Sequence, residues 1–343
     1  MQKRVLGRTG LEVSAIGCGG IPIRRAEIPE AVRVLQKAVD LGINYFDTAR
    51  GYEGSETRVG LAFQGRRDKV IIASKSRGST EDMLQRIEES LKALRIDYID
   101  IYKVHGAGGS PETLEKALAS GGPLEGIEKA KQQGKVRFTG MSGHRPDILA
   151  QAIKTGRIDV ILVPFNFVND LPAKELFPVA KEYNVGVTIM KPIGGSLFQH
   201  PDLCLRWILE HDAVSTICVG MWKESEVEQN AAVGRDPRPL NDEEREWLRL
   251  ERLRWERCYC RLCYTCNPCP LDVPVRSLII VDLDYRRLGL KTQMDWGLKE
   301  WLEAVKKCEP CEVCLVKCAY DMPIRKLMLD VRRRYLPIVE AHK

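Results

Sequence analysis

The chain has 343 residues, of which 44% are hydrophobic and 29% are charged, a composition that excludes a disordered or collagen-like protein. Its 53 basic and 47 acidic residues are interspersed and give a formal net charge of +6, so the charge pattern offers little support for nucleic-acid binding. By length, the chain has room for a barrel of about 250 residues and a second, smaller domain.

The amino-terminal segment MQKRVLGRTGLEVSAIG has basic residues but no continuous apolar stretch, so it does not read as a secretory signal. No run of about 18 apolar residues follows, and we expect no membrane-spanning segment. Together these features predict a cytoplasmic protein, in which cysteines stay reduced and structural disulfides are rare.

The first part of the chain alternates short β-branched segments with amphipathic stretches. The opening VLGRTGLEV predicts a hairpin that could plug the floor of a barrel. Strands are predicted at residues 14–19, 43–47, 70–75, 99–105, 138–142, 160–164, 187–191 and 216–220. Helices are predicted at residues 30–41, 81–94, 123–133, 173–182 and 202–210. Eight β–α units predict a closed (β/α)8 TIM barrel. A Rossmann fold is not favoured, because the GCGG at 17–20 lacks the glycine spacing of a Rossmann fingerprint.

The 12 cysteines divide the chain in two. Cys18, Cys204 and Cys218 are isolated and are expected to be buried apolar side chains. The other nine lie between Cys258 and Cys318. We therefore predict a barrel at 1–240, a charged connecting helix at 241–257 and a cysteine-rich domain at 258–343.

The cysteine-rich domain contains two closely spaced runs, CxxCxxCxxCP and CxxCxxCxxxC. The second has the spacing of bacterial ferredoxins, in which three thiolates hold one iron–sulfur cluster and the fourth reaches the neighbouring cluster. Two [4Fe–4S] clusters are predicted, one on Cys260, Cys263, Cys266 and Cys318, the other on Cys308, Cys311, Cys314 and Cys269. Structural zinc is the alternative, and Cys258 is left without a role. The fold expected for this domain is small, helical and ferredoxin-like.

Ionisable residues stand where several predicted barrel strands end. The second strand ends at Asp47 and its loop carries Tyr52, the third ends at Lys75, and the fourth ends at His105. Chemistry in a barrel takes place at the carboxyl ends of its strands. Each residue alone has a structural explanation, but the four together predict a catalytic site.

These segments resemble the aldo-keto reductase family. The resemblance covers roughly residues 1–235 and is carried by GRTGLEVSAIGCGG, NYFDTA followed by GYEGSE, ASK, DYIDIY leading to His105, and GKVR before GMS. With its cysteine runs, the whole chain is similar to the subfamily bearing a carboxyl-terminal ferredoxin-like domain. The resemblance implies hydride transfer from NADPH, or from NADH, to an aldehyde or ketone.

The chemistry expected of the four residues is consistent with that reaction. A carbonyl that accepts hydride becomes an alkoxide and needs a proton donor. Tyr52 is the expected general acid, and a buried lysine beside a tyrosine favours release of its proton. Lys75 would supply that charge and Asp47 would keep it ionised, while His105 would polarise the carbonyl oxygen.

The cofactor-binding residues implied by the resemblance depart in part from the family pattern. Ser142 is followed by Gly143 where asparagine is usual, Leu162 stands at a usual glutamine, and Met190 replaces an aromatic ring. The remaining expected contacts lie at the end of the eighth strand and after it: Gly220, Lys223, Glu226, Gln229 and Asn230.

Three functional hypotheses remain open for the two domains together. The first is a carbonyl reductase whose clusters are structural or oxygen-sensing. The second is an electron relay that works with a ferredoxin-type redox partner on a different reduction. The third is a cofactor sensor without catalysis.

Overall fold

The computed structural model describes residues 1–266, 268–308, 311, 313–314 and 318–342. The chain forms two compact units. The first consists of residues 1–193 and 200–240, and the second of residues 194–199 and 241–343. The second unit thus includes a six-residue segment from the middle of the chain, which is named the 194–199 segment below.

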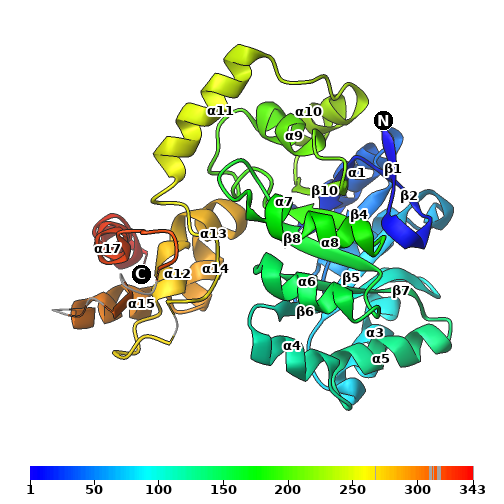
Figure 1. Cartoon of the computed structure of the whole chain (residues 1–343), viewed down its shortest axis with the longest axis horizontal. Coiled ribbons are helices and arrows are strands. Elements are labelled where there is room, and N and C mark those ends of the chain that lie inside the picture. Colours follow the sequence, from blue (N-terminus) through cyan, green and yellow to red (C-terminus); the bar gives the residue numbers. More distant parts are fainter. Residues whose placement is uncertain (267, 309–310, 312, 315–317, 343) are drawn as a thin grey trace. The chain divides into compact units, whose positions relative to one another are not determined.

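The first unit is built around a closed barrel of eight parallel strands (Figure 1), which confirms the predicted (β/α)8 fold. The barrel strands are β3 (Ile16–Gly19), β4 (Tyr45–Asp47), β5 (Ile71–Ser76), β6 (Ile99–Gly108), β7 (Val136–Gly143), β8 (Val160–Pro164), β9 (Gly186–Met190) and β10 (Val214–Gly220). Each strand pairs with the next, and β10 closes the ring against β3. The strands are almost wholly buried, as expected for a parallel sheet covered on its outer face.

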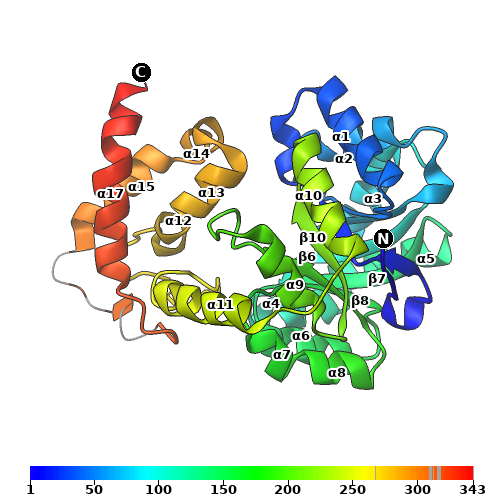
Figure 2. The ribbon, with the colours of Figure 1, turned by 90° about the horizontal axis from the view of Figure 1, so that it is seen from above.

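Helices cover the outside of this barrel (Figure 2). They are α1 (Ile28–Asp40), α2 (Ser55–Ala62), α3 (Thr80–Leu94), α4 (Pro111–Leu118), α5 (Pro123–Gln132), α6 (Pro146–Lys154), α7 (Leu171–Glu175), α8 (Phe177–Glu182), α9 (Pro201–Leu209) and α10 (Glu224–Arg235). Ser79 caps α3 in a capping box with Asp82. The prediction of a single helix at 173–182 is wrong, because α7 and α8 are separate helices. Pro178 has no backbone N–H to continue the first helix, and it lies in the first turn of the second.

A hairpin precedes the barrel and fills one end of it. β1 (Lys3–Val5) and β2 (Glu12–Ser14) are antiparallel. Leu6 and Val13 are fully buried in a cluster with side chains from inside the barrel, such as Ile101. Gly7 has a positive φ, and a Cβ there would lie 2.3 Å from the backbone nitrogen of Gly186. The plug therefore needs glycine at this position, both for its conformation and for its close approach to β9.

The described part of the second unit is helical. It contains α11 (Asp242–Trp255), α12 (Val275–Ile279), α13 (Val281–Leu288), α14 (Leu290–Asp295), α15 (Leu298–Ala304) and α17 (Ile324–Ala341). α17 packs along α12 and α15 (Figure 2), and Leu278, Leu302 and Met328 are fully buried between them. Among the helices of the described residues, none is long and apolar enough to cross a membrane.

The 194–199 segment contacts residues far along the chain. Phe198 is 5% exposed and packs against the rings of Trp255 and Tyr259, at centroid distances of 5.5 and 5.1 Å. The Arg286 guanidinium donates a hydrogen bond to the carbonyl oxygen of Ser196. These contacts explain why the segment clusters with the second unit, although it lies between β9 and α9 in the sequence.

Candidate active site and cysteine-lined cavity

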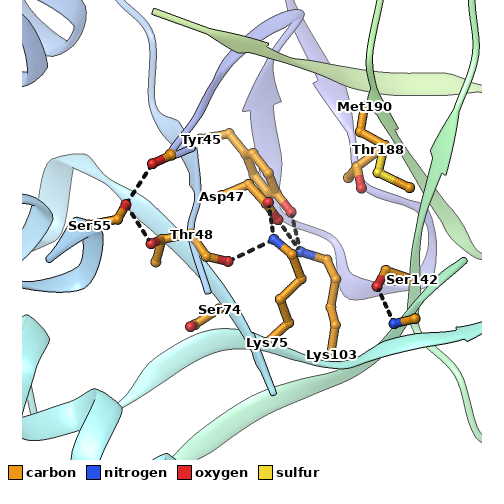
Figure 3. A network of polar contacts seen from close by, with 12 residues as sticks. Tyr45, Asp47, Thr48, Ser55, Ser74, Lys75, Lys103, Ser142, Thr188 and Met190 are labelled. Carbon is orange, nitrogen blue, oxygen red and sulfur yellow. Dashed lines mark hydrogen bonds and ion pairs between the residues drawn. The ribbon is translucent and has the colours of Figure 1, made fainter. Parts of the chain in front are cut away.

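Three neighbouring strands carry ionisable side chains into the carboxyl end of the barrel, and Figure 3 shows Asp47 and Lys75 among them. Asp47 ends β4, Lys75 lies near the end of β5, and His105 lies in β6. Because β4 pairs with β5 and β5 pairs with β6, these residues are brought together by adjacent strands. Tyr52 lies in the loop between β4 and α2, where its backbone N–H bonds to the carbonyl of Ala49.

Asp47 and Lys75 form a buried ion pair at the base of this site. Lys75 Nζ lies 2.5 Å from Asp47 Oδ1 and also donates to the carbonyl oxygen of Thr48. Burial favours the neutral lysine, but the adjacent carboxylate outweighs it and raises the pKa of Lys75. Lys75 is therefore a permanent positive charge at the floor of the site.

Tyr52 and His105 lie above that charge. Lys75 Nζ is 4.7 Å from the centroid of the Tyr52 ring. The His105 ring meets the Tyr52 ring edge-on, with 5.9 Å between centroids. Burial, with the charges of Lys75 and Arg77, lowers the pKa of His105 to about 3. The imidazole is therefore neutral near pH 7 and acts on a ligand by hydrogen bonding.

Lys103 is a site residue that the sequence analysis missed. It lies in β6, two positions before His105, and its side chain is fully buried. Its Nζ is 2.7 Å from Asp47 Oδ2, so Asp47 is shared by two lysines. Both lysines lower the pKa of Asp47 against the opposing effect of burial. In a strand, every second side chain points to the same face, so Ile101, Lys103 and His105 share the barrel interior. A lysine at one of these interior positions was the signal in the sequence that Lys103 belongs to the site.

The expected nicotinamide-side residues lie on β7 and β9. Ser142 is buried, and its hydroxyl accepts a hydrogen bond from the backbone N–H of Gly106. Met190 is partly buried at the end of β9 and packs against the cluster of side chains inside the barrel. The following residue, Lys191, lies 3.0 Å from Nε2 of His144. Ser142 thus holds the loop after His105 in place.

The other expected cofactor residues lie at the end of β10 and in the residues that follow it. Gly220 ends the strand against the ring of Pro22, which a Cβ would contact at 2.6 Å. Gln229 is exposed and Asn230 is buried on α10. The Glu226 carboxylate accepts hydrogen bonds from the backbone N–H groups of Trp222 and Lys223. Glu226 therefore caps α10 with its own negative charge.

Two cations lie close to the ring of Trp222, shortly after the end of β10. The Arg25 guanidinium lies 4.6 Å from its ring centroid, and Lys223 Nζ lies 4.7 Å from it. An aromatic face with two basic side chains has the chemistry that a nucleotide with phosphate groups requires. The donor set here thus fits a nicotinamide dinucleotide.

Among the described residues no cysteine forms a disulfide, and Cys18, Cys204 and Cys218 are buried as expected. In the second unit, five cysteines line one cavity together with apolar side chains such as Val275 and Met328. The five are Cys266, Cys269, Cys308, Cys311 and Cys314. Within the described residues, no three His, Cys, Asp or Glu side chains are grouped closely enough to hold a metal ion. A concentration of thiols in an apolar setting nevertheless suits iron–sulfur chemistry.

Electrostatic interactions connect the two cysteine runs. Besides burial, Cys269, Cys314 and Cys311 raise the pKa of Cys308. Likewise, burial and then Cys263 raise the pKa of Cys266, with smaller effects from Cys318 and Cys314. Each run thus interacts with a cysteine of the other. Cys258, by contrast, is exposed and directs its thiol to backbone carbonyls of α11.

Comparison with known proteins shows the family of this chain. A family model described as the aldo/keto reductase family matches residues 15–202. The L-galactose dehydrogenase of Arabidopsis thaliana is 31% identical over 315 residues, covering 74% of this chain and 97% of that protein. The chain belongs to the aldo/keto reductase family. It is therefore an oxidoreductase of an NAD(P)H-dependent family.

Solved structures resemble this aldo/keto reductase over its barrel. The holo form of aldo-keto reductase AKR11C1 from Bacillus halodurans is 27% identical, with a TM-score of 0.65. The match covers 73% of this chain and 96% of that protein's chain. An aldo-keto reductase from Klebsiella pneumoniae in complex with NADPH is also 27% identical, covering 73% and 95%, with a TM-score of 0.63. The cysteine runs of this aldo/keto reductase lie beyond the residues that the family model matches.

Proposed function

We propose that the barrel reduces an aldehyde or ketone with Tyr52 as the general acid. The observation that carries this proposal is the convergence of Asp47, Tyr52, Lys75 and His105 from three adjacent strand ends. Lys75, held by Asp47, lies under the Tyr52 ring. This arrangement favours a reductase over a non-catalytic sensor or an electron relay, neither of which needs a proton donor over a buried ammonium.

Each residue has a separate task in the proposed reaction. Tyr52 gives its hydroxyl proton to the carbonyl oxygen, and the Lys75 ammonium stabilises the negative charge left on the phenol. Asp47 keeps Lys75 charged and fixed in position. His105, being neutral near pH 7, donates a hydrogen bond to the same carbonyl oxygen and orients it.

The cofactor in this proposal is NADPH, with NADH as the alternative. When bound, the reduced nicotinamide supplies the hydride. Arg25 and Lys223 would meet the phosphates and Trp222 the adenine, while Ser142 and Met190 would lie on the nicotinamide side. Gly220, Glu226, Gln229 and Asn230 complete the nucleotide-binding end in this proposal. Glu226 disfavours a phosphate immediately at the start of α10, because its carboxylate already fills that position.

We further propose that the second unit is a ferredoxin-like module holding two [4Fe–4S] clusters. Cys260, Cys263, Cys266 and Cys318 would hold one, and Cys308, Cys311, Cys314 and Cys269 the other. The cavity supports a shared module, since Cys266 and Cys269 of the first run line it together with Cys308, Cys311 and Cys314 of the second run. A ferredoxin-type redox partner would exchange electrons with such a module.

Reduced nicotinamide consumption tests the reductase directly. Anaerobically reconstituted protein is mixed with NADPH or NADH and a panel of aldehydes and ketones, including aldoses. Carbonyl-dependent loss of the reduced cofactor is expected, with a decrease of at least about 100-fold in Tyr52→Phe, the range of general acid catalysis. If Tyr52→Phe is as active as the wild type, Tyr52 is not the proton donor.

Iron content tests the cysteine assignment. Cys269→Ser and Cys318→Ser should each lose one cluster, seen as iron, labile sulfide and the visible iron–thiolate absorption falling by half. Cys258→Ser is the matched control and should keep the full content, because this exposed cysteine is not among the proposed ligands. Bound zinc in place of iron would overturn the assignment.

A further inference from the structure

Lys103 is built into the centre of the barrel. It pairs in register with Lys75 on β5 and with Gly140 on β7. A Cβ on Gly140 would lie 2.7 Å from Cγ of Lys103, so the glycine makes room for the lysine side chain. The side chain of Lys103 is 0% exposed. A lysine in this place is costly and is expected to act on the groups around it.

Two oxygens lie within hydrogen-bonding distance of the Lys103 nitrogen. Its Nζ atom is 2.7 Å from Oδ2 of Asp47 and 3.2 Å from the hydroxyl oxygen of Tyr45.

Lys103 consequently has two acceptors among the described residues, the Tyr45 hydroxyl and Asp47 Oδ2. An ammonium has three N–H groups and a neutral amine has two. Two acceptors match the amine, whereas an ammonium would leave one N–H buried without a partner. Lys75 is better placed to be charged, because an Asp47 oxygen at 2.5 Å and the Thr48 carbonyl oxygen at 2.8 Å accept from it, and its nitrogen also lies 4.7 Å from the centroid of the Tyr52 ring.

The charges around Lys103 lead to the same conclusion. The ionisable groups that face it are Asp47 and Tyr45 from β4, Lys75 from β5 and Cys218 from β10. Burial raises the pKa of Tyr45 and of Cys218 well above their ordinary values, so both are neutral. Within the part of the chain that the structure describes, Asp47 is thus the one anion that faces both lysines. A neutral Lys103 therefore leaves this buried group without net charge. Burial, and the nearby Lys75, lower the pKa of Lys103.

We propose that Lys103 is held as a neutral amine near pH 7 and is a positioning residue whose uptake of a proton adds a second positive charge beneath Tyr52. With Lys103 neutral, the Asp47 carboxylate serves Lys75 alone. When Lys103 takes a proton from solvent, its amine becomes an ammonium, and the added charge stabilises negative charge on the Tyr52 oxygen. Reduction, which needs a proton from Tyr52, is then favoured on the acid side. This catalytic part rests on the proposed function.

Proton uptake on unfolding tests the protonation state without any assay of activity. The free energy of unfolding is measured against pH for the wild type and for Lys103→Met, which has a similar length and cannot titrate. Near pH 7, unfolding of the wild type should take up about one proton more than unfolding of the variant, because an unfolded lysine is charged. Equal uptake would mean that Lys103 is already charged in the fold, which overturns the proposal.

The pH dependence of turnover tests the catalytic part. In the wild type, kcat for carbonyl reduction should rise on the order of tenfold as the pH is lowered. This is the effect of a unit charge about 10 Å away at an effective dielectric constant of about 20. Lys103→Met should lack this rise. A uniform decrease of kcat at every pH would indicate a structural role and refute this part.

Tyr45→Phe provides a second, milder variant. It removes one acceptor from Lys103 and leaves Asp47 in place, so the acid-side rise should move to lower pH without disappearing. An unmoved rise would show that the Tyr45 hydroxyl, and hence the hydrogen-bond count, does not control Lys103. If no carbonyl is reduced by the wild type, the proposed function fails, while the proton-uptake measurement still decides the state of Lys103.

Discussion

Asp47→Asn should be among the most destabilising single-atom changes in the barrel. The carboxylate is 5% exposed, and its two oxygens lie 2.5 and 2.7 Å from the ammonium nitrogen of Lys75 and the amine of Lys103. The asparagine keeps one acceptor but carries no negative charge, so the buried Lys75 ammonium loses its ion-pair partner. Breaking a buried ion pair by removing one partner costs about 3–5 kcal/mol, and we expect a decrease of this size in the free energy of unfolding.

The assay is urea unfolding at pH 7, with the slope against urea compared between proteins to confirm that the same transition is measured. Asp40→Asn is the matched control, because Asp40 pairs with Arg66 on the surface with 59% of its side chain exposed. That change should cost at most about 1 kcal/mol. If Asp47→Asn falls within this range of the wild type, the lysines do not depend on the carboxylate and the account of the buried site is wrong.

The same variant has a defined pH dependence. The lysines lower the pKa of Asp47 in the folded protein. The carboxylate therefore contributes stability at pH values above its unfolded pKa of about 3.9, and this contribution is lost as pH falls through the lower folded pKa. The difference in stability between the wild type and Asp47→Asn should accordingly shrink in acid.

Two further variants probe the histidine and the 194–199 segment. Because the pKa of His105 is lowered to about 3, the wild type should lose stability as pH falls from about 6.5 towards 3. The measurement is the slope of the unfolding free energy against pH. In His105→Gln this slope should decrease by the amount that corresponds to about one proton. Phe198→Ala removes a buried ring that packs against Trp255 and Tyr259, and it should decrease the stability of the second unit by about 3–5 kcal/mol. Thermal unfolding followed by tryptophan fluorescence measures this decrease. An unchanged transition would show that the 194–199 segment is not anchored by these rings.

The barrel could be predicted from the sequence because its signals are local. Each strand is a short apolar segment, and each predicted strand overlaps an observed one, with residues 160–164 matching β8 at both ends. The catalytic candidates were found for a related reason: Asp47, Lys75 and His105 are ionisable residues at or near the carboxyl ends of such segments. Pairing of adjacent parallel strands then brings them together without further information.

Other features depend on contacts that are distant in sequence. Lys103 is a charged residue in the middle of an apolar strand, and its role rests on Asp47, 56 positions away. The 194–199 segment has no local property that shows its packing against Trp255. Glu226 was expected near a bound nucleotide, and only the structure shows its carboxylate closing the first turn of α10. Such features follow from the tertiary fold and from no single stretch of sequence.

The path of the chain between the two units has a consequence for synthesis on the ribosome. The chain passes between them after Ile193, after Gln199 and after Leu240. The whole barrel, including β10, is therefore translated before most of the second unit, whereas Phe198 emerges well before its partners Trp255 and Tyr259. Since domains generally fold as units in the order of synthesis, the nascent barrel can close while this phenylalanine is still uncovered. Burial of Phe198 against these rings must therefore wait until Trp255 and Tyr259 have been made, after the last strand of the barrel.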